Sequence, residues 1–150
     1  MAMEMKTRLS DALKESMKAG DEVRKRTVRM VLAAIKQAEI DRQVTLDETA
    51  VLSILQKEIK MRKESLEEAK QAGRDDLARD AQAEIDVLNA FLPAGLSPDE
   101  LRPIVQAAIT EVGASSITDM GKVMKVLLPK VAGRAPGDQV SAMVRELLQK

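Results

Sequence analysis

The residue types that perform most enzymatic chemistry are missing from this chain. Its 150 residues include no Cys, His, Trp or Tyr, and Phe91 is the single aromatic residue. Without Cys or His, the chain has no thiol nucleophile, no imidazole base, no disulfide and none of the usual zinc ligand sets. Catalysis would have to use carboxylates, Lys or hydroxyl groups alone. The lack of aromatic residues also argues against binding of single-stranded nucleic acid, which stacks its bases on aromatic rings.

Two patterns resemble known sites without matching them. The pair Gly121-Lys122 lacks both the first Gly and the Ser or Thr of a phosphate-binding loop, and no strand precedes it. The carboxylates of Asp76, Asp80 and Glu84 share one helix face and could hold Mg²⁺. Acidic residues in a first helical turn also offset the helix dipole, and we expect a solvated face of that kind. The sequence therefore predicts neither a metal site nor a cofactor.

Positive charge gathers in two places, and these residues are the candidate binding residues. The chain balances 24 Lys and Arg against 24 Asp and Glu, so only local patches can attract an anion. On a helix, Lys25, Arg29 and Lys36 fall within about 40° of one another, opposite the expected apolar stripe. Such patches bind nucleic acid phosphates or are simply solvated surface, and Gly in a loop lets backbone approach a phosphate. The second group comprises Lys122, Lys125, Lys130, Gly133 and Arg134.

The distribution of proline divides the chain into two parts. All five prolines lie after residue 92, the first of them at Pro93. We therefore expect an N-terminal helical domain over 1–92 and a C-terminal three-helix domain over 93–150. No alternating apolar pattern of strand length occurs. The predicted fold is all-α, with N-terminal helical hairpins or a bundle followed by a small three-helix domain.

The N-terminal part shows four helical patterns, at about 7–18, 22–41, 47–71 and 74–92. Gly20 and Gly73 are expected helix stops. We expect Thr45 to cap the third helix, with Glu48 as its capping-box partner. The apolar stripes of the second and fourth helices include Met30 and Leu77, which are therefore expected in the core.

The C-terminal part shows three amphipathic helices. Ser97-Pro98-Asp99-Glu100 combines an N-cap Ser, a Pro at the first helical position and a Glu at the third. Gly113 is the expected end of that helix, and the hydroxyl groups of Ser115 and Ser116 are the expected caps of the next. The second helix, with Leu128 on its apolar stripe, is expected to end at Pro129.

Composition also suggests a cellular compartment. No apolar run approaches the roughly 18 residues needed to span a bilayer, and the first residues have no signal-peptide pattern. The absence of Cys fits a reducing compartment. We therefore expect a cytoplasmic protein without a membrane segment.

Four stretches carry a resemblance to a known family: 25–30 (KRTVRM), 57–65 (KEIKMRKES), 119–124 (DMGKVM) and 129–134 (PKVAGR). The chain resembles the YqeY-like proteins of the GatB/YqeY family from end to end. Its C-terminal part is similar to the tail of the B subunit of the glutamine-dependent aspartyl/glutamyl-tRNA amidotransferase. It departs from the family at Ala135-Pro136-Gly137, where the family usually reads Ala-Asp-Gly.

The resemblance implies an all-helical, two-part fold and tRNA as the partner, because the amidotransferase tail helps hold tRNA at its elbow. The catalytic body of that subunit has no counterpart here. We therefore expect a non-catalytic RNA-binding helper, and a carbon–nitrogen ligase label would be inherited from the family. Two alternatives stay open: an adaptor that docks on an amidotransferase or an aminoacyl-tRNA synthetase, and an accessory to a glutamine-dependent carbon–nitrogen ligase. The oligomeric state and the identity of the RNA also stay open.

Overall fold

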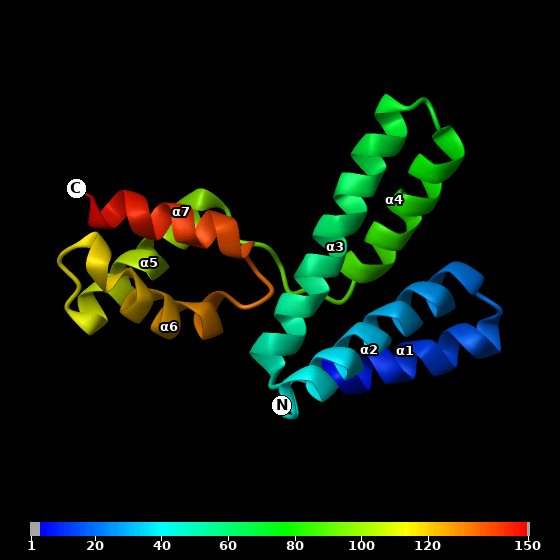
Figure 1. Cartoon of the computed structure of the whole chain (residues 1–150), viewed down its shortest axis with the longest axis horizontal. Coiled ribbons are helices and arrows are strands. Elements are labelled where there is room, and N and C mark those ends of the chain that lie inside the picture. The colour runs from blue at the N-terminus through cyan, green and yellow to red at the C-terminus, as the bar shows by residue number, and fades with distance from the viewer. Residues whose placement is uncertain (1–3, 150) are drawn as a thin grey trace. The chain divides into compact units, whose positions relative to one another are not determined.

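The computed structural model describes residues 4–149, and over these residues it is all-helical. Seven α-helices and one short 3₁₀ turn make up its secondary structure, without a strand (Figure 1). The predicted all-α fold class is therefore confirmed. The chain separates into two compact units, the first ending at Leu92 and the second beginning at Pro93. That each unit is a domain able to fold alone stays a prediction.

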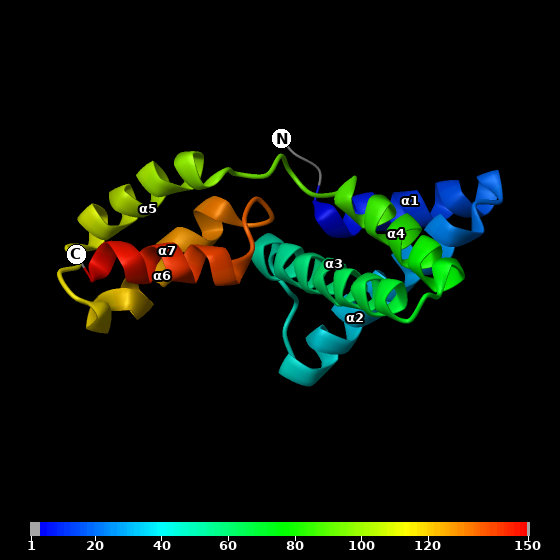
Figure 2. The same cartoon turned by 90° about the horizontal axis from the view of Figure 1, so that it is seen from above.

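The first unit consists of two helical hairpins. Helices α1 (Met5–Ala19) and α2 (Glu22–Arg42) form one, and α3 (Glu48–Gln71) and α4 (Asp75–Asn89) form the other. Both views show α3 and α4 side by side (Figures 1 and 2), and α2 packs against the second hairpin through α3 and α4. Short joints after α1 and α3 turn the chain back on itself, which makes each hairpin antiparallel.

Glycine and aspartate set the ends of these helices. Gly20 and Gly73 have φ of 70°, the left-handed conformation that ends a helix, as predicted. Asp47, rather than Thr45, caps α3, because its Oδ1 accepts the Ala50 N–H at 2.9 Å. The expected cap was wrong because Asp47 directly precedes the first helical residue. Glu48 instead caps α1, because its two carboxylate oxygens accept the Met5 N–H at 3.1 Å each.

The buried face of α2 is rotated around the helix axis from the apolar stripe that the sequence predicted. The buried residues of α2 are Thr27, Val28, Val31 and Ile35. Met30, expected in the core, is 50% exposed, and Leu77 of α4 is exposed as well. α2 packs on α1, α3 and α4, so its buried arc is centred closer to Val31 and Ile35 than the apolar stripe indicated.

A buried charged group joins three helices of this unit. Arg62 of α3 is 7% exposed, and its Nη1 donates to the Glu58 carboxylate at 2.7 Å and to the Glu58 carbonyl at 3.0 Å. Its Nε has no hydrogen-bond partner and lies 3.6 Å from a carboxylate oxygen of Glu84 on α4. The other oxygen of Glu84 lies 3.7 Å from Nε of Arg26 on α2. Glu58 and Arg62 are four residues apart, a spacing that permits such a pair on a helix, but spacing alone does not indicate that Arg62 is buried.

The second unit contains α5 (Pro98–Val112), a 3₁₀ turn (Ile117–Asp119), α6 (Met120–Val131) and α7 (Gly137–Leu148). Figure 2 shows the three α-helices together around a common interior. The described part of this core is entirely apolar. Its fully buried members include Val105, Val123, Leu127, Val131, Val140 and Val144. Each helix contributes one side to this core, as the sequence predicted.

The helix caps and ends predicted for this unit were partly correct. The capping box of α5 is present: Ser97 Oγ accepts the Glu100 N–H at 3.2 Å, and Glu100 Oε1 accepts the Ser97 N–H at 3.1 Å. Gly113 ends α5 with φ of 66°. After it, the carboxylate of Asp119 accepts the Ser115 N–H at 3.1 Å, so the expected hydroxyl caps were wrong.

α6 does not end at Pro129 as expected. It continues to Val131, with Pro129 inside its last turn. The fixed φ of proline fits a helix, and the cost is the missing backbone hydrogen bond. Because Val131 is buried, continuing the helix places one more apolar side chain in the core. Leu128, expected on the apolar stripe, is 40% exposed.

Candidate nucleic-acid interface

Two lysines protrude from the side of α6 that faces away from its core. Val123, Leu127 and Val131 are buried, which turns Lys122 and Lys125 outward. The Lys122 side chain is 75% exposed, and its Nζ lies 4.0 Å from Asp119 Oδ1. Lys125 is exposed and forms no ion pair within the described residues. Both ammonium groups are therefore available to an anion in solution.

Asp119 is the carboxylate nearest to these lysines, and it is already engaged. The pKa of Asp119 is lowered, first because its carboxylate accepts the Ser115 backbone N–H and, to a smaller degree, because of the charge of Lys122. The group therefore stays ionised at neutral pH and orders the turn before α6. At a distance of 4.0 Å it restrains Lys122 only weakly.

Lys130 follows on the same helix and is paired. Its Nζ lies 2.8 Å from Glu111 Oε2 of α5, and both side chains are about half exposed. An ion pair of that exposure contributes little stability, so it can open at low cost. A phosphate that competes with Glu111 would free Lys130, which lies about 80° around the helix axis from Lys122 and beside α5.

Gly133 and Arg134 lie in the loop after α6, and both have structural roles there. Gly133 is buried with φ of 74°, which a side chain would make unfavourable. The Arg134 carbonyl accepts the Leu96 N–H at 2.8 Å, and the Arg134 Nε donates to the Ala94 carbonyl at 3.1 Å. Arg134 thus anchors the segment before α5, and part of its guanidinium is committed to that contact.

The other candidate residues belong to α2, in the first unit. Lys25 is partly covered and pairs with Glu22 at 2.9 Å, whereas Arg29 and Lys36 are exposed and form no ion pair within the described residues. The structure therefore places Lys122 and Lys125 on one side of α6, Lys130 on the same helix beside α5, and the three α2 residues on a separate helix of the first unit.

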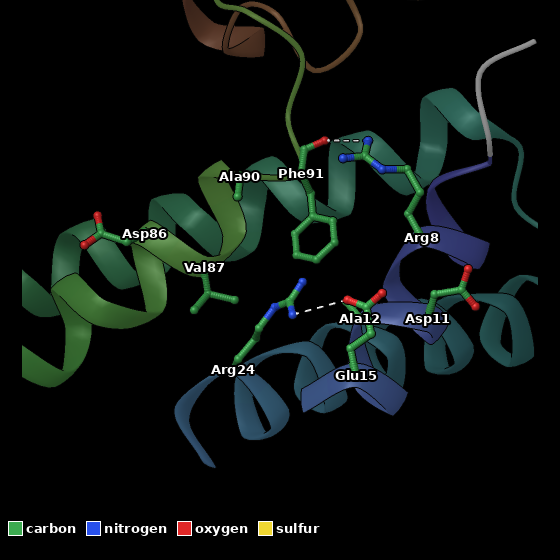
Figure 3. Close-up of a pocket in the computed structure, with 9 residues that line it drawn as sticks. All are labelled: Arg8, Asp11, Ala12, Glu15, Arg24, Asp86, Val87, Ala90 and Phe91. Carbon is green, nitrogen blue, oxygen red and sulfur yellow. Dashed lines mark hydrogen bonds and ion pairs between the residues drawn. The ribbon is translucent and has the colours of Figure 1, made fainter. Parts of the chain in front are cut away.

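A pocket that the sequence did not indicate lies where α1, α2 and α4 meet (Figure 3). Its volume is about 570 Å³, and Phe91 projects into it between Arg8 and Arg24. The guanidinium of Arg8 lies 5.6 Å from the ring centroid, and its Nη1 donates to the Phe91 carbonyl at 3.1 Å. Arg24 lies 3.5 Å from Glu15. Both charge signs line the pocket and both arginines are engaged, so its lining selects no single class of ligand.

The carboxylates considered as a metal site have separate partners. Asp76 accepts hydrogen bonds from Arg74 at 3.1 and 3.2 Å, which is the main reason that the pKa of Asp76 is lowered. Glu84 faces Arg26 and Arg62 instead. Within residues 4–149 no group of three or more acidic side chains is arranged to hold a metal ion.

The fold and the site define a class: a small helical protein of two units, with free lysines on an outer helix face. A family model described as Yqey-like protein matches residues 6–148. The chain therefore belongs to the YqeY-like family, and the resemblance seen in the sequence is confirmed.

Curated relatives share one name. Altered inheritance of mitochondria protein 41, mitochondrial, from Pyrenophora tritici-repentis is 30% identical over 147 residues, which cover 94% of this chain and 79% of the relative. The protein of that name from Eremothecium gossypii is 39% identical over 87 residues, covering 57% and 48%. The one from Lachancea thermotolerans is 40% identical over 85 residues, covering 56% and 46%. The chain spans about half the length of these last two relatives.

These names overturn the expected cytoplasmic location, because each of these relatives is named as mitochondrial. The expectation was wrong because it rested on the lack of Cys and of a signal-peptide pattern. The cellular location of a protein is determined by its targeting segment and not by the composition of its folded domain. Within the described residues, no helix combines the length and apolar character required to cross a membrane.

Proposed function

We propose that this YqeY-like protein is a helper that binds tRNA through the exposed lysines of α6. The observation that carries the proposal is the freedom of Lys122 and Lys125, which point away from the core of the second unit. Two of the stretches that carry the family resemblance, 119–124 and 129–134, overlap this helix, and the C-terminal part of the chain is similar to the tRNA-holding tail of the amidotransferase B subunit. Charge placement and family likeness thus support the same surface.

The mode of binding follows from the residue types on this surface. Lysine ammonium groups contact phosphate as point charges, and the surface has no aromatic ring on which a base could stack. Recognition therefore uses the backbone and the shape of a folded RNA. Lys130 joins the contact when a phosphate replaces Glu111, and Gly133 and Arg134 hold the loop that ends the surface.

The helper role rests on the chemistry that the chain offers. It has no Cys and no His, and the carboxylates of Glu58, Glu84 and Asp76 are bound to arginines. A protein of this kind would present tRNA to a separate catalyst, such as a glutamine-dependent ligase, rather than transfer an amide group itself.

The test is a fluorescence anisotropy titration of total tRNA at 50 and 200 mM salt. The double variant Lys122→Glu/Lys125→Glu should bind at least about tenfold more weakly. Loss of two phosphate contacts should reduce the slope of log affinity against log salt by about 2. The matched control is Lys57→Glu/Lys60→Glu on α3, because these lysines have the same spacing, are exposed and form no ion pair within the described residues.

The control should keep the wild-type affinity within about twofold and keep the wild-type slope. Equal losses in both double variants would show that any basic patch serves, which contradicts a surface on α6. Unchanged binding in the α6 variant, or no tRNA binding by the wild-type protein at 50 mM salt, would also refute the proposal.

A further inference from the structure

The outward face of α2 exposes a line of apolar side chains. Met30 is 50% exposed, Ile40 is 59% exposed, and Ala33 lies between them on the same face. With Gln37 these residues follow one another at intervals of three, four and three, the spacing by which one helix packs along another. None of them contributes to the core of the first unit, whose α2 residues lie on the opposite side.

Basic side chains border this line along one edge. Arg29 and Lys36 each precede a residue of the line by one position, which places them beside it on the helix surface. Both are exposed and form no ion pair within the described residues. A hollow of about 420 Å³ opens on this face, and Met30 and Ala33 line it together with Lys25, Arg26, Arg29 and one carboxylate, Glu22, which pairs with Lys25 at 2.9 Å. The face therefore combines an apolar line with a positive border.

We propose that this face of α2 docks an acidic amphipathic helix of a protein partner. Apolar side chains of that helix would pack on Met30, Ala33 and Ile40, and its carboxylates would pair with Arg29 and Lys36. Burial of the exposed apolar surface supplies the affinity, and the charge border sets the orientation and rejects basic helices. This inference goes beyond the proposed function and uses none of the residues of the tRNA surface on α6.

The charge and the apolar side chains of this face argue against two other occupants, an RNA backbone and a second copy of the chain. An RNA backbone would use Arg29 and Lys36 but would gain nothing from Met30 and Ile40, and the described part of α2 offers it no aromatic ring. In an antiparallel twofold pairing of two copies, Arg29 and Lys36 of both copies would meet along the same edge and repel one another. An acidic partner satisfies both features at once.

The test uses a display library of random 16-residue peptides, selected on the full-length wild-type protein. Enriched peptides should carry apolar residues at i, i+3 or i+4, and i+7, with Asp or Glu between them. One enriched peptide is then synthesised and titrated against three variants that are first checked by circular dichroism. Ile40→Glu removes the apolar end of the line, and Arg29→Glu/Lys36→Glu reverses the border.

Both of these variants should bind the peptide at least about tenfold more weakly. The control Lys57→Glu/Lys60→Glu should bind it within about twofold of the wild-type protein. Ile40 is used in place of Met30 because the sulfur of Met30 lies 3.9 Å from the Arg62 guanidinium, and its replacement would disturb that group.

Several outcomes would overturn the inference. One is a selection that enriches nothing, or enriches peptides without carboxylates. Another is an enriched peptide that binds the α2 variants as tightly as the wild-type protein. Sedimentation that shows a wild-type dimer dissociated by Ile40→Glu would identify a second copy as the occupant. A tRNA affinity that falls with Arg29→Glu/Lys36→Glu would identify RNA instead.

Discussion

The two units of this protein both present basic residues on an outer helix face, but they differ in what lies beside the charge. On α6, within the described residues, the one exposed large apolar side chain is that of Leu128, while Met124 and Val126 are half-buried. On α2 the basic residues border a line of exposed apolar side chains that includes Met30 and Ile40. The same residue types therefore suit different partners, since phosphates need only charge and a docking helix needs apolar surface as well.

The cores of the two units differ as well. The first unit buries Arg62, which faces the half-buried carboxylates of Glu58 and Glu84, whereas the described core of the second unit is apolar throughout. A long helical pair can surround a charged group with carboxylates from two helices, while a unit of three short helices has little interior to spare. Both units therefore rest on apolar packing, and the first adds a buried arginine whose ionic contacts join neighbouring helices.

The largest effect that tests this contrast should come from Arg62→Ala. Removing the guanidinium leaves Glu58 without its partner and Glu84 with Arg26 alone, which should lower the free energy of unfolding by about 3 kcal/mol. The matched change in the second unit is Arg102→Ala, because Arg102 faces Glu146 at 3.6 Å across an exposed pair. That variant should lose less than about 1 kcal/mol. Urea unfolding measures both, and equal losses would contradict the contrast.

A smaller effect should appear in the dependence of stability on pH. The pKa of Glu39 is lowered, first because its carboxylate accepts a hydrogen bond from Lys6 and next because it accepts the Leu46 N–H at 2.8 Å. A lowered pKa in the folded state gives stability that is complete above the ordinary carboxyl pKa and is lost as the pH falls through the folded value. Glu39→Gln should therefore destabilise the protein at pH 7, and the difference from the wild-type protein should shrink as the pH falls below the ordinary carboxyl pKa.

The second unit provides the comparison for that measurement. The pKa of Glu100 is lowered mainly because it accepts the Ser97 N–H, three residues away in the same capping box. Glu39 instead joins α2 to residues 33 and 7 positions away. Glu39→Gln should thus lose more stability at pH 7 than Glu100→Gln, as measured by thermal unfolding at several pH values. A larger loss in Glu100→Gln would reverse the comparison.

The smallest expected effect concerns the start of α7. Pro136 occupies the N-cap position with φ of −62° and ψ of 143° and provides no side-chain cap. Pro136→Asp restores the residue usual in the family and should add a cap of about 1 kcal/mol, offset in part by lost proline rigidity. The net gain should be about 0.5 kcal/mol in urea unfolding. Pro136→Ala, which loses rigidity without adding a cap, should be less stable than the wild-type protein, and equal stability of the two variants would argue against the cap.

Much of the fold could be predicted from local signals, because those signals act within one turn of helix. Gly20, Gly73 and Gly113 end helices through backbone conformations that glycine adopts easily. The capping box at Ser97 is likewise complete within four residues. The helix end predicted at Pro129 was wrong because the helix continues to Val131, whose burial depends on packing against other helices rather than on a local signal.

The candidate sites were less predictable because they depend on which helix face packs inward. The stripe that placed Met30 in the core is a valid helical period, and only the packing against α1, α3 and α4 turns Val28 and Ile35 inward instead. Arg62 has the spacing of a surface ion pair with Glu58, and its burial depends on Glu84 from another helix. The pocket around Phe91 draws on three helices, so no local pattern could reveal it.

The most direct test of the central claim compares the two basic faces in one tRNA titration. Lys122→Glu/Lys125→Glu and Arg29→Glu/Lys36→Glu change the net charge equally, so a nonspecific loss of attraction affects both alike. We predict that the α6 variant loses at least about tenfold in tRNA affinity and about 2 in salt slope, while the α2 variant stays within about twofold of the wild-type protein. Equal losses in the two variants, or a larger loss in the α2 variant, would contradict the assignment of the two faces to different partners.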